Sequence, residues 1–179
     1  MAKQSASITV RAPVEQVYRL FTRFEHFPKF MSHVKEVTHL DDRRTHWVAD
    51  ILGTREWNAV TENCIPNQQI GWRSIDGVAH RGTVTFVSLA DDRTDVHVDV
   101  EYEPPAGALG SLGETLGGGA EFARRLQHDL DQFAQMVYAA PPGALDPTSS
   151  SYLFHDGSAA ARSNAPDARD TSLEESARK

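Results

Sequence analysis

Residues 94–103, TDVHVDVEYE, alternate between apolar and polar side chains. The apolar members share one face of an extended chain: Val96, Val98, Val100 and Tyr102. Acidic and histidine side chains occupy the opposite face. This two-residue period predicts a strand with one buried and one solvated face, which is typical of an antiparallel sheet.

The same period extends upstream to Ser32. It predicts further strands at residues 33–40, 45–52, 54–63, 69–75 and 80–89, with the sixth at 94–103. Turn-forming residues separate them, among them Gly53, Asp76-Gly77 and Asp91-Asp92. Because such short connections join neighbouring antiparallel strands, the pattern predicts a meander.

Other periods flank the meander. Residues 5–10 alternate between apolar and polar side chains, which predicts a first strand. Residues 13–22 repeat apolar side chains at helical spacing and predict an amphipathic helix that begins at a proline. Residues 24–31 predict a short helical turn, because Pro28 prevents a longer helix. After a Pro- and Gly-rich connector at residues 104–119, a long amphipathic helix is predicted at 120–140. Its apolar stripe comprises Phe122, Leu126, Leu130, Phe133 and Val137, and Asp129 is assigned to the polar side.

This order of elements predicts an α+β fold in which a curved, seven-stranded antiparallel sheet wraps on a long C-terminal helix, with two short helices after the first strand. A twisted sheet of seven strands is too large for one helix to cover. The uncovered space predicts an apolar cavity between sheet and helix.

Composition divides the chain in two. Residues 141–179 are rich in Pro, Ser, Ala and Asp and lack Val, Ile, Met and Trp, so a flexible, disordered tail is predicted after a folded domain at 1–140. In the tail, a cluster at residues 151–155 is either a docking motif or inert. The remaining 140 residues suit one domain.

Charge and residue usage exclude several classes of function. Lys and Arg number 18 against 25 Asp and Glu, a net charge of −7, and no basic block is present, so neither nucleic acid nor an anionic membrane is an expected partner. No apolar stretch is long enough for membrane insertion or secretion, which predicts a cytoplasmic protein. The single Cys and the scattered histidines predict no metal site, and no cofactor motif is present. A monomer or homodimer is expected.

Several segments resemble the START-like, helix-grip superfamily, and within it the bacterial polyketide cyclase/dehydrase (SRPBCC) group. They are ITVRAPVEQVY at 8–18, FPKFM at 27–31, WVA at 47–49, EWNA at 56–59, GWRS at 71–74, GTVTF at 82–86 and YEPP at 102–105. The resemblance spans about residues 4–139. It implies either binding of a hydrophobic molecule or aldol-type cyclisation and dehydration of a poly-ketone, because the superfamily includes both carriers and aromatase/cyclases.

Strand alternation assigns all three tryptophans to the inner face of the sheet. The predicted ligand-binding set comprises Phe24, Phe27, Phe30, Trp47, Trp57, Trp72, His80, Val84, Phe86, Val98, Tyr102, Phe122 and Leu126. An alternative interpretation is that these aromatic residues only fill the core.

Two residues are candidates for catalysis. His80, near a strand end on the inner face, has an intrinsic pKa suited to acid–base work, although a histidine satisfied within the core is an open alternative. Arg73 points to solvent by simple alternation and reaches the cavity only if a bulge turns it inward. Three hypotheses follow: a binding protein for a hydrophobic or aromatic molecule, a catalytic cyclase or dehydratase, and a non-catalytic lipid or quinone carrier or protein-interaction module.

Overall fold

A computed structural model describes residues 1–50, 53–103 and 118–155 of the chain. The elements are β1 (Ala2–Val10), α1 (Val14–Phe21), the 3-10 helix η1 (Phe24–Lys29), β2 (Val34–His39), β3 (Arg44–Asp50), β4 (Thr54–Ile65), β5 (Gln69–Ser74), β6 (His80–Ala90), β7 (Arg93–Tyr102) and α2 (Gly118–Ala139). The chain divides into two compact units, residues 1–140 and 141–179, and all of these elements lie in the first.

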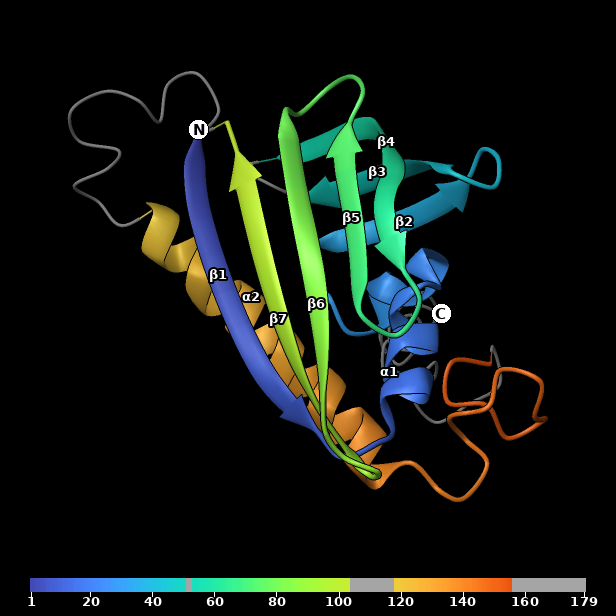
Figure 1. Ribbon diagram of the computed structural model, residues 1–179. Helices are drawn as coiled ribbons and strands as arrows, with labels where there is room; N and C mark the ends of the chain where they lie inside the picture. The colour runs from blue at the N-terminus through green and yellow to red at the C-terminus, as the bar shows by residue number, and fades with distance from the viewer. Residues whose placement is uncertain (51–52, 104–117, 156–179) are drawn as a thin grey trace, which may run out of the picture. The chain divides into compact units, whose positions relative to one another are not determined.

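All seven strands belong to one antiparallel sheet, in the order β1-β7-β6-β5-β4-β3-β2. Strands β2 to β7 are a meander, and β1 returns to pair with β7 along its whole length, from Ala2 opposite Tyr102 to Val10 opposite Thr94. The sheet curls around α2 (Figure 1). The predicted α+β, helix-grip fold is thereby confirmed.

The boundaries of several elements differ from the prediction. β1 begins at Ala2 instead of residue 5, because pairing with β7 keeps its polar first residues extended. β4 continues to Ile65 through an irregularity in its pairing with β5, where Asn63 adopts a φ of 52°. The end of the predicted strand 45–52 and most of the connector 104–119 lie outside the described residues.

An aromatic core fills one part of the space between α2 and the sheet. Phe133 of α2 is fully buried, and its ring lies 4.7 Å from Phe21 of α1 and 5.0 Å from Phe30, centroid to centroid. The predicted stripe residues Leu126, Leu130 and Val137 are also buried.

Asp129 corrects the predicted polar side of α2. Its side chain is fully buried, although the sequence pattern assigns it to the solvated face. Residue 129 stands three positions after Leu126 and four before Phe133, so a helix places it beside both. The apolar stripe missed this position because a carboxylate does not register in a hydrophobic pattern.

The second unit is described as far as residue 155. Residues 141–155 form consecutive turns, in which the Leu153 N–H donates to the Ala144 carbonyl at 2.7 Å. The rings of Tyr152 and Phe154 meet edge to face at 5.8 Å.

Within the described ranges, none of the helices combines the length with the apolar character needed to cross a bilayer. In the same ranges, no three His, Cys, Asp or Glu side chains are grouped as metal ligands would be.

Candidate functional site

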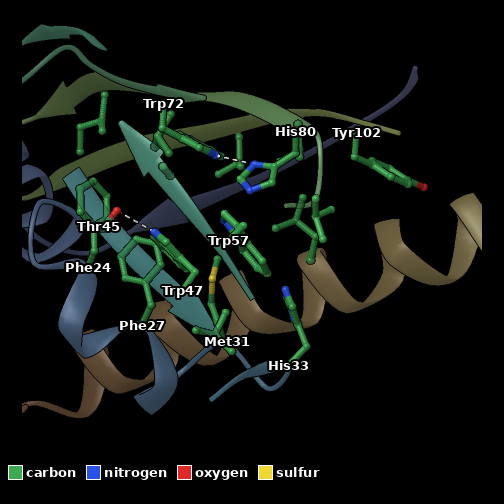
Figure 2. Close-up of a pocket in the computed structure, with 18 of the residues that line it drawn as sticks. Phe24, Phe27, Met31, His33, Thr45, Trp47, Trp57, Trp72, His80 and Tyr102 are labelled. Carbon is green, nitrogen blue, oxygen red and sulfur yellow. Dashed lines mark hydrogen bonds between the residues drawn. The ribbon is translucent and has the colours of Figure 1, made fainter. Parts of the chain in front are cut away.

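A mostly apolar cavity of about 170 Å³ lies inside the first unit, bounded by the sheet, η1 and the N-terminal part of α2 (Figure 2). Its lining includes eleven of the thirteen predicted ligand-binding residues: Phe24, Phe27, Trp47, Trp57, Trp72, His80, Val84, Val98, Tyr102, Phe122 and Leu126. The strand alternation therefore identified the inner face, whereas a ligand-binding role for these residues stays a prediction.

The other two predicted residues, Phe30 and Phe86, are buried but do not line the cavity. Phe86 packs against Phe21 and Tyr18 at 5.5 and 5.4 Å, and Phe30 packs against Phe133. Both belong to the aromatic core. Both side chains point inward as predicted. They lie in the aromatic core instead of the cavity because α1 and α2 cover that part of the sheet.

Arg73 lies on the outer face of β5. Its side chain is half exposed, and its Nε donates to Glu62 Oε2 at 3.0 Å. Because Val60 pairs with Arg73 in regular register, no bulge turns the guanidinium inward. Simple alternation therefore describes this residue correctly, and the structure places Arg73 away from the cavity.

Two stacked tryptophans form one wall of the cavity. Trp47 and Trp57 are cross-strand partners on β3 and β4, with nearly parallel rings whose centroids are 6.1 Å apart. The Trp47 indole N–H donates to the buried hydroxyl of Thr45 at 2.8 Å (Figure 2). Trp47 is thus satisfied inside the protein, and its ring is held in one orientation.

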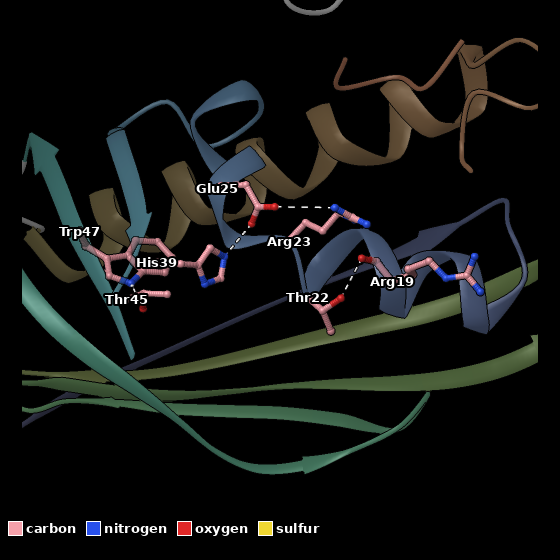
Figure 3. Close-up of polar contacts among 7 residues, drawn as sticks. All are labelled: Arg19, Thr22, Arg23, Glu25, His39, Thr45 and Trp47. Carbon is pink, nitrogen blue, oxygen red and sulfur yellow. Dashed lines mark hydrogen bonds and ion pairs between the residues drawn. The ribbon is translucent and has the colours of Figure 1, made fainter. Parts of the chain in front are cut away.

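Polar contacts anchor η1, which carries Phe24 and Phe27 to this wall. Glu25 lies 2.9 Å from His39 Nε2 of β2 and 3.8 Å from Arg23 Nη1 (Figure 3). Partial burial would raise the pKa of Glu25, but hydrogen bonds from His39 and the backbone and the nearby histidines outweigh it and hold that pKa below its usual value. The link joins η1 to the sheet outside the cavity.

His80 stands between two tryptophans. Trp72 Nε1–H donates to His80 Nδ1 at 3.2 Å, and the Trp57 ring meets the imidazole edge to face at 5.0 Å (Figure 2). Burial lowers the pKa of His80 to about 4. A neutral imidazole that accepts at Nδ1 carries its proton on Nε2, so His80 is a donor at its other nitrogen and is poorly suited to act as a base.

This arrangement leaves two N–H groups unused. His80 Nε2 and Trp57 Nε1 are buried, and neither has a hydrogen-bond partner among the described residues. One imidazole cannot accept from both indoles in its neutral form. Each buried donor without a partner lowers the folding stability by about 1–3 kcal/mol. This end of the cavity is therefore less stable than a fully hydrogen-bonded core.

Gly82 makes room for Trp72. The two residues are cross-strand partners, and a β-carbon on Gly82 would overlap the six-membered ring of Trp72 and lie 2.8 Å from the Asp99 carbonyl. We expect Gly82→Ala to displace the indole, break its hydrogen bond to His80 and destabilise the protein by about 1–3 kcal/mol. Urea unfolding and tryptophan emission measure both effects; exposed Ser88→Ala on the same strand should change stability by less than about 0.5 kcal/mol. Equal stability of the two variants would contradict this packing.

The sequence interpretation missed a histidine–carboxylate pair at the cavity. His33, in the turn before β2, lines the cavity, and its Nδ1 lies 3.3 Å from Oδ2 of the buried Asp129 of α2. Asp129 Oδ1 also accepts from the Ser32 N–H at 3.2 Å. These residues are about a hundred positions apart in the chain, so no spacing in the sequence relates them.

A curled antiparallel sheet gripping a C-terminal helix around an apolar cavity defines the START-like, helix-grip class of proteins. Solved structures similar to this one include a START superfamily protein from Mycobacterium smegmatis (TM-score 0.62, 20% identity, covering 75% of this chain and 98% of that one). The Zhui aromatase/cyclase from Streptomyces sp. R1128 is also similar (TM-score 0.63, 15% identity, 76% and 93% covered). At these identities the likeness is one of fold.

The family model described as polyketide cyclase / dehydrase and lipid transport matches residues 10–130, and the chain belongs to this family. A relative from Streptomyces lincolnensis, described as an uncharacterized 17.2 kDa protein, is 34% identical over 140 residues, which cover 76% of this chain and 90% of the relative. The family resemblance predicted from the sequence is thereby confirmed.

Proposed function

We propose that this protein binds a hydrophobic or aromatic small molecule in the cavity between the sheet and α2. The observation that carries the proposal is the cavity itself, a space of about 170 Å³ that is partly open to solvent and is lined by aromatic and aliphatic side chains. A core built only for stability fills such a space, because empty volume in a protein costs free energy.

The size of the cavity narrows the class of ligand. An apolar cavity of about 150 Å³ in another protein holds one benzene ring. A molecule that fits wholly within this space is therefore compact, with about one aromatic ring. Family membership supports the proposal, since the family's description names polyketide cyclases and lipid transport. The acidic charge of the chain supports a small neutral or apolar partner over a nucleic acid.

Titration with indane, 2-indanone, 1,4-naphthoquinone and a fatty acid, followed by tryptophan fluorescence, tests this function. Because Trp47, Trp57 and Trp72 all line the cavity, a ligand there alters their emission. Saturable binding of a ring-sized molecule is the expected result. Lack of a saturable response to all four compounds would show that the cavity is not a binding site for this class.

A matched pair on β6 tests whether binding occurs in the cavity. Val84 is buried and lines the cavity, whereas Val87 is 44% exposed on the same strand. We expect Val84→Phe to place a ring in the cavity and to weaken binding at least about tenfold, since the ligand loses its apolar contacts. Val87→Phe should bind as the wild type does. Binding that survives Val84→Phe would place the ligand elsewhere.

A further inference from the structure

The cavity wall around His80 holds more hydrogen-bond donors than acceptors. Trp72 Nε1–H donates to His80 Nδ1 at 3.2 Å, and this contact uses the one lone pair that a neutral imidazole offers. His80 Nε2 and Trp57 Nε1 are buried nitrogens without a hydrogen-bond partner among the described residues. Two N–H groups therefore lack an acceptor at the same end of the cavity.

The two side chains that carry these donors are fixed by their contacts. Trp57 is 6% exposed, and its ring stacks on Trp47 and meets the imidazole of His80 edge to face at 5.0 Å. The backbone N–H of His80 donates to the Ser74 hydroxyl at 3.0 Å. Figure 2 shows the two rings next to each other at the cavity wall. Because packing holds both rings in one orientation, an acceptor for them has to come from a molecule in the cavity.

The charge of the donors indicates the chemistry of that molecule. An indole N–H is neutral, and burial lowers the pKa of His80 to about 4, so the imidazole is neutral at physiological pH. Two lining residues of full charge, Arg55 and Glu103, are exposed and opposite in sign. A carboxylate beside the two donors would lose the hydration of a full charge, whereas a neutral oxygen exchanges its hydrogen bonds with water for bonds to the protein.

We propose that Trp57 Nε1–H and His80 Nε2–H bind an oxygen acceptor of a neutral, ring-sized ligand. The inference rests on the binding function proposed above and adds the polar group that the ligand carries. The aromatic wall holds the ring, and the two donors orient its oxygen. Trp72 is a positioning residue, because its N–H keeps the proton of His80 on Nε2. An analogue without the oxygen leaves both donors buried and unpaired, which such a site discriminates against.

Calorimetric titration of the full chain with indane and 2-indanone tests this inference, since the two compounds share a ring system and differ by one carbonyl oxygen. Calorimetry replaces fluorescence here because the variants change the tryptophan content. A cavity without donors binds indane more tightly, because the ketone loses its hydrogen bonds to water. We expect the wild type to bind 2-indanone at least as tightly as indane.

Trp57→Phe and Trp47→Phe form a matched pair. Both remove an indole N–H from the cavity wall, but the Trp47 N–H is already paired with the Thr45 hydroxyl. We expect Trp57→Phe to reduce the affinity for 2-indanone relative to indane by about tenfold. Trp47→Phe should weaken both compounds by similar factors. The same ratio of affinities in the wild type and in Trp57→Phe overturns the proposed donor.

A second measurement decides the question if Trp57→Phe does not fold. The indole N–H of Trp57 gives its own proton NMR signal in ¹⁵N-labelled wild type, and spectra of Trp47→Phe and Trp72→Phe assign it by elimination. A hydrogen bond moves an N–H proton signal downfield. Saturating 2-indanone should therefore move this signal further downfield than indane does, and equal positions with the two compounds overturn the contact.

The outcomes separate this inference from the binding function. If indane binds but the oxygen of 2-indanone gains nothing from Trp57, the donor site is wrong and the binding function stands. If none of the four compounds of the titration panel binds, both proposals are wrong. Indane-2-carboxylate tests the charge of the ligand, and tighter binding of this anion than of 2-indanone overturns the neutral class. A preference for 2-indanone that requires Trp57 but not Trp47 supports the donor pair.

Discussion

Phe133→Ala should destabilise the protein by about 3–5 kcal/mol, the largest effect expected of any single substitution considered for this chain. Phe133 is fully buried on α2, and its ring contacts Phe21 of α1 and Phe30 after η1. Truncation removes a side chain on which α1 and the segment after η1 both pack, and it leaves a void in the aromatic core. A loss of this size is a large share of the roughly 5–15 kcal/mol that holds a typical domain folded.

Urea denaturation followed by circular dichroism measures the loss of free energy of unfolding. Gln132→Ala is the matched control because residue 132 is the exposed neighbour of Phe133 on the same helix. It should change stability by less than about 0.5 kcal/mol. A similar small effect for Phe133→Ala would mean that α2 does not pack on the aromatic core as described.

The second large effect concerns pH. Burial lowers the pKa of His80 to about 4 in the folded protein, whereas an unfolded chain has the ordinary value of about 6.5. Between these values the unfolded state binds a proton that the folded state does not, so folding stability falls as pH decreases through this window. The full difference corresponds to roughly 3 kcal/mol.

The His80 contribution is measured as a difference between two proteins. His80→Asn retains an oxygen near the position of Nδ1 that can accept from Trp72 Nε1–H, but it does not titrate. We expect the wild type to lose stability relative to this variant as pH falls from about 6.5 to about 4, and the difference to level off below that range. Parallel stability curves for the two proteins over this range would show that His80 is not held neutral by burial.

Much of the site could be predicted from local pattern. The alternation around Trp47, Trp57 and Trp72 assigns these residues to one face of the sheet, and the structure places all three around the cavity. The same alternation places Arg73 outside, where it pairs with Glu62. These predictions succeed because side-chain direction in a regular strand depends only on position along that strand.

Predictions that depend on how elements pack together were less complete. Inward direction predicts Phe30 and Phe86 in the ligand-binding set together with Phe27 and Val84, yet the structure places both in the aromatic core around Phe21 and Phe133. Inward direction does not tell where along the sheet the core ends and the cavity begins. That boundary depends on the positions at which α1 and α2 cross the sheet.

The sequence by itself determined the α+β class, the meander of strands, the inner face of the sheet and the family, because each is encoded in short-range periodicity or in motifs. Only the tertiary structure decided that Asp129 is buried and lies beside His33. A carboxylate on a helix near the end of the domain and a histidine in a turn near its beginning have no local relation. Their proximity arises when the sheet curls around α2.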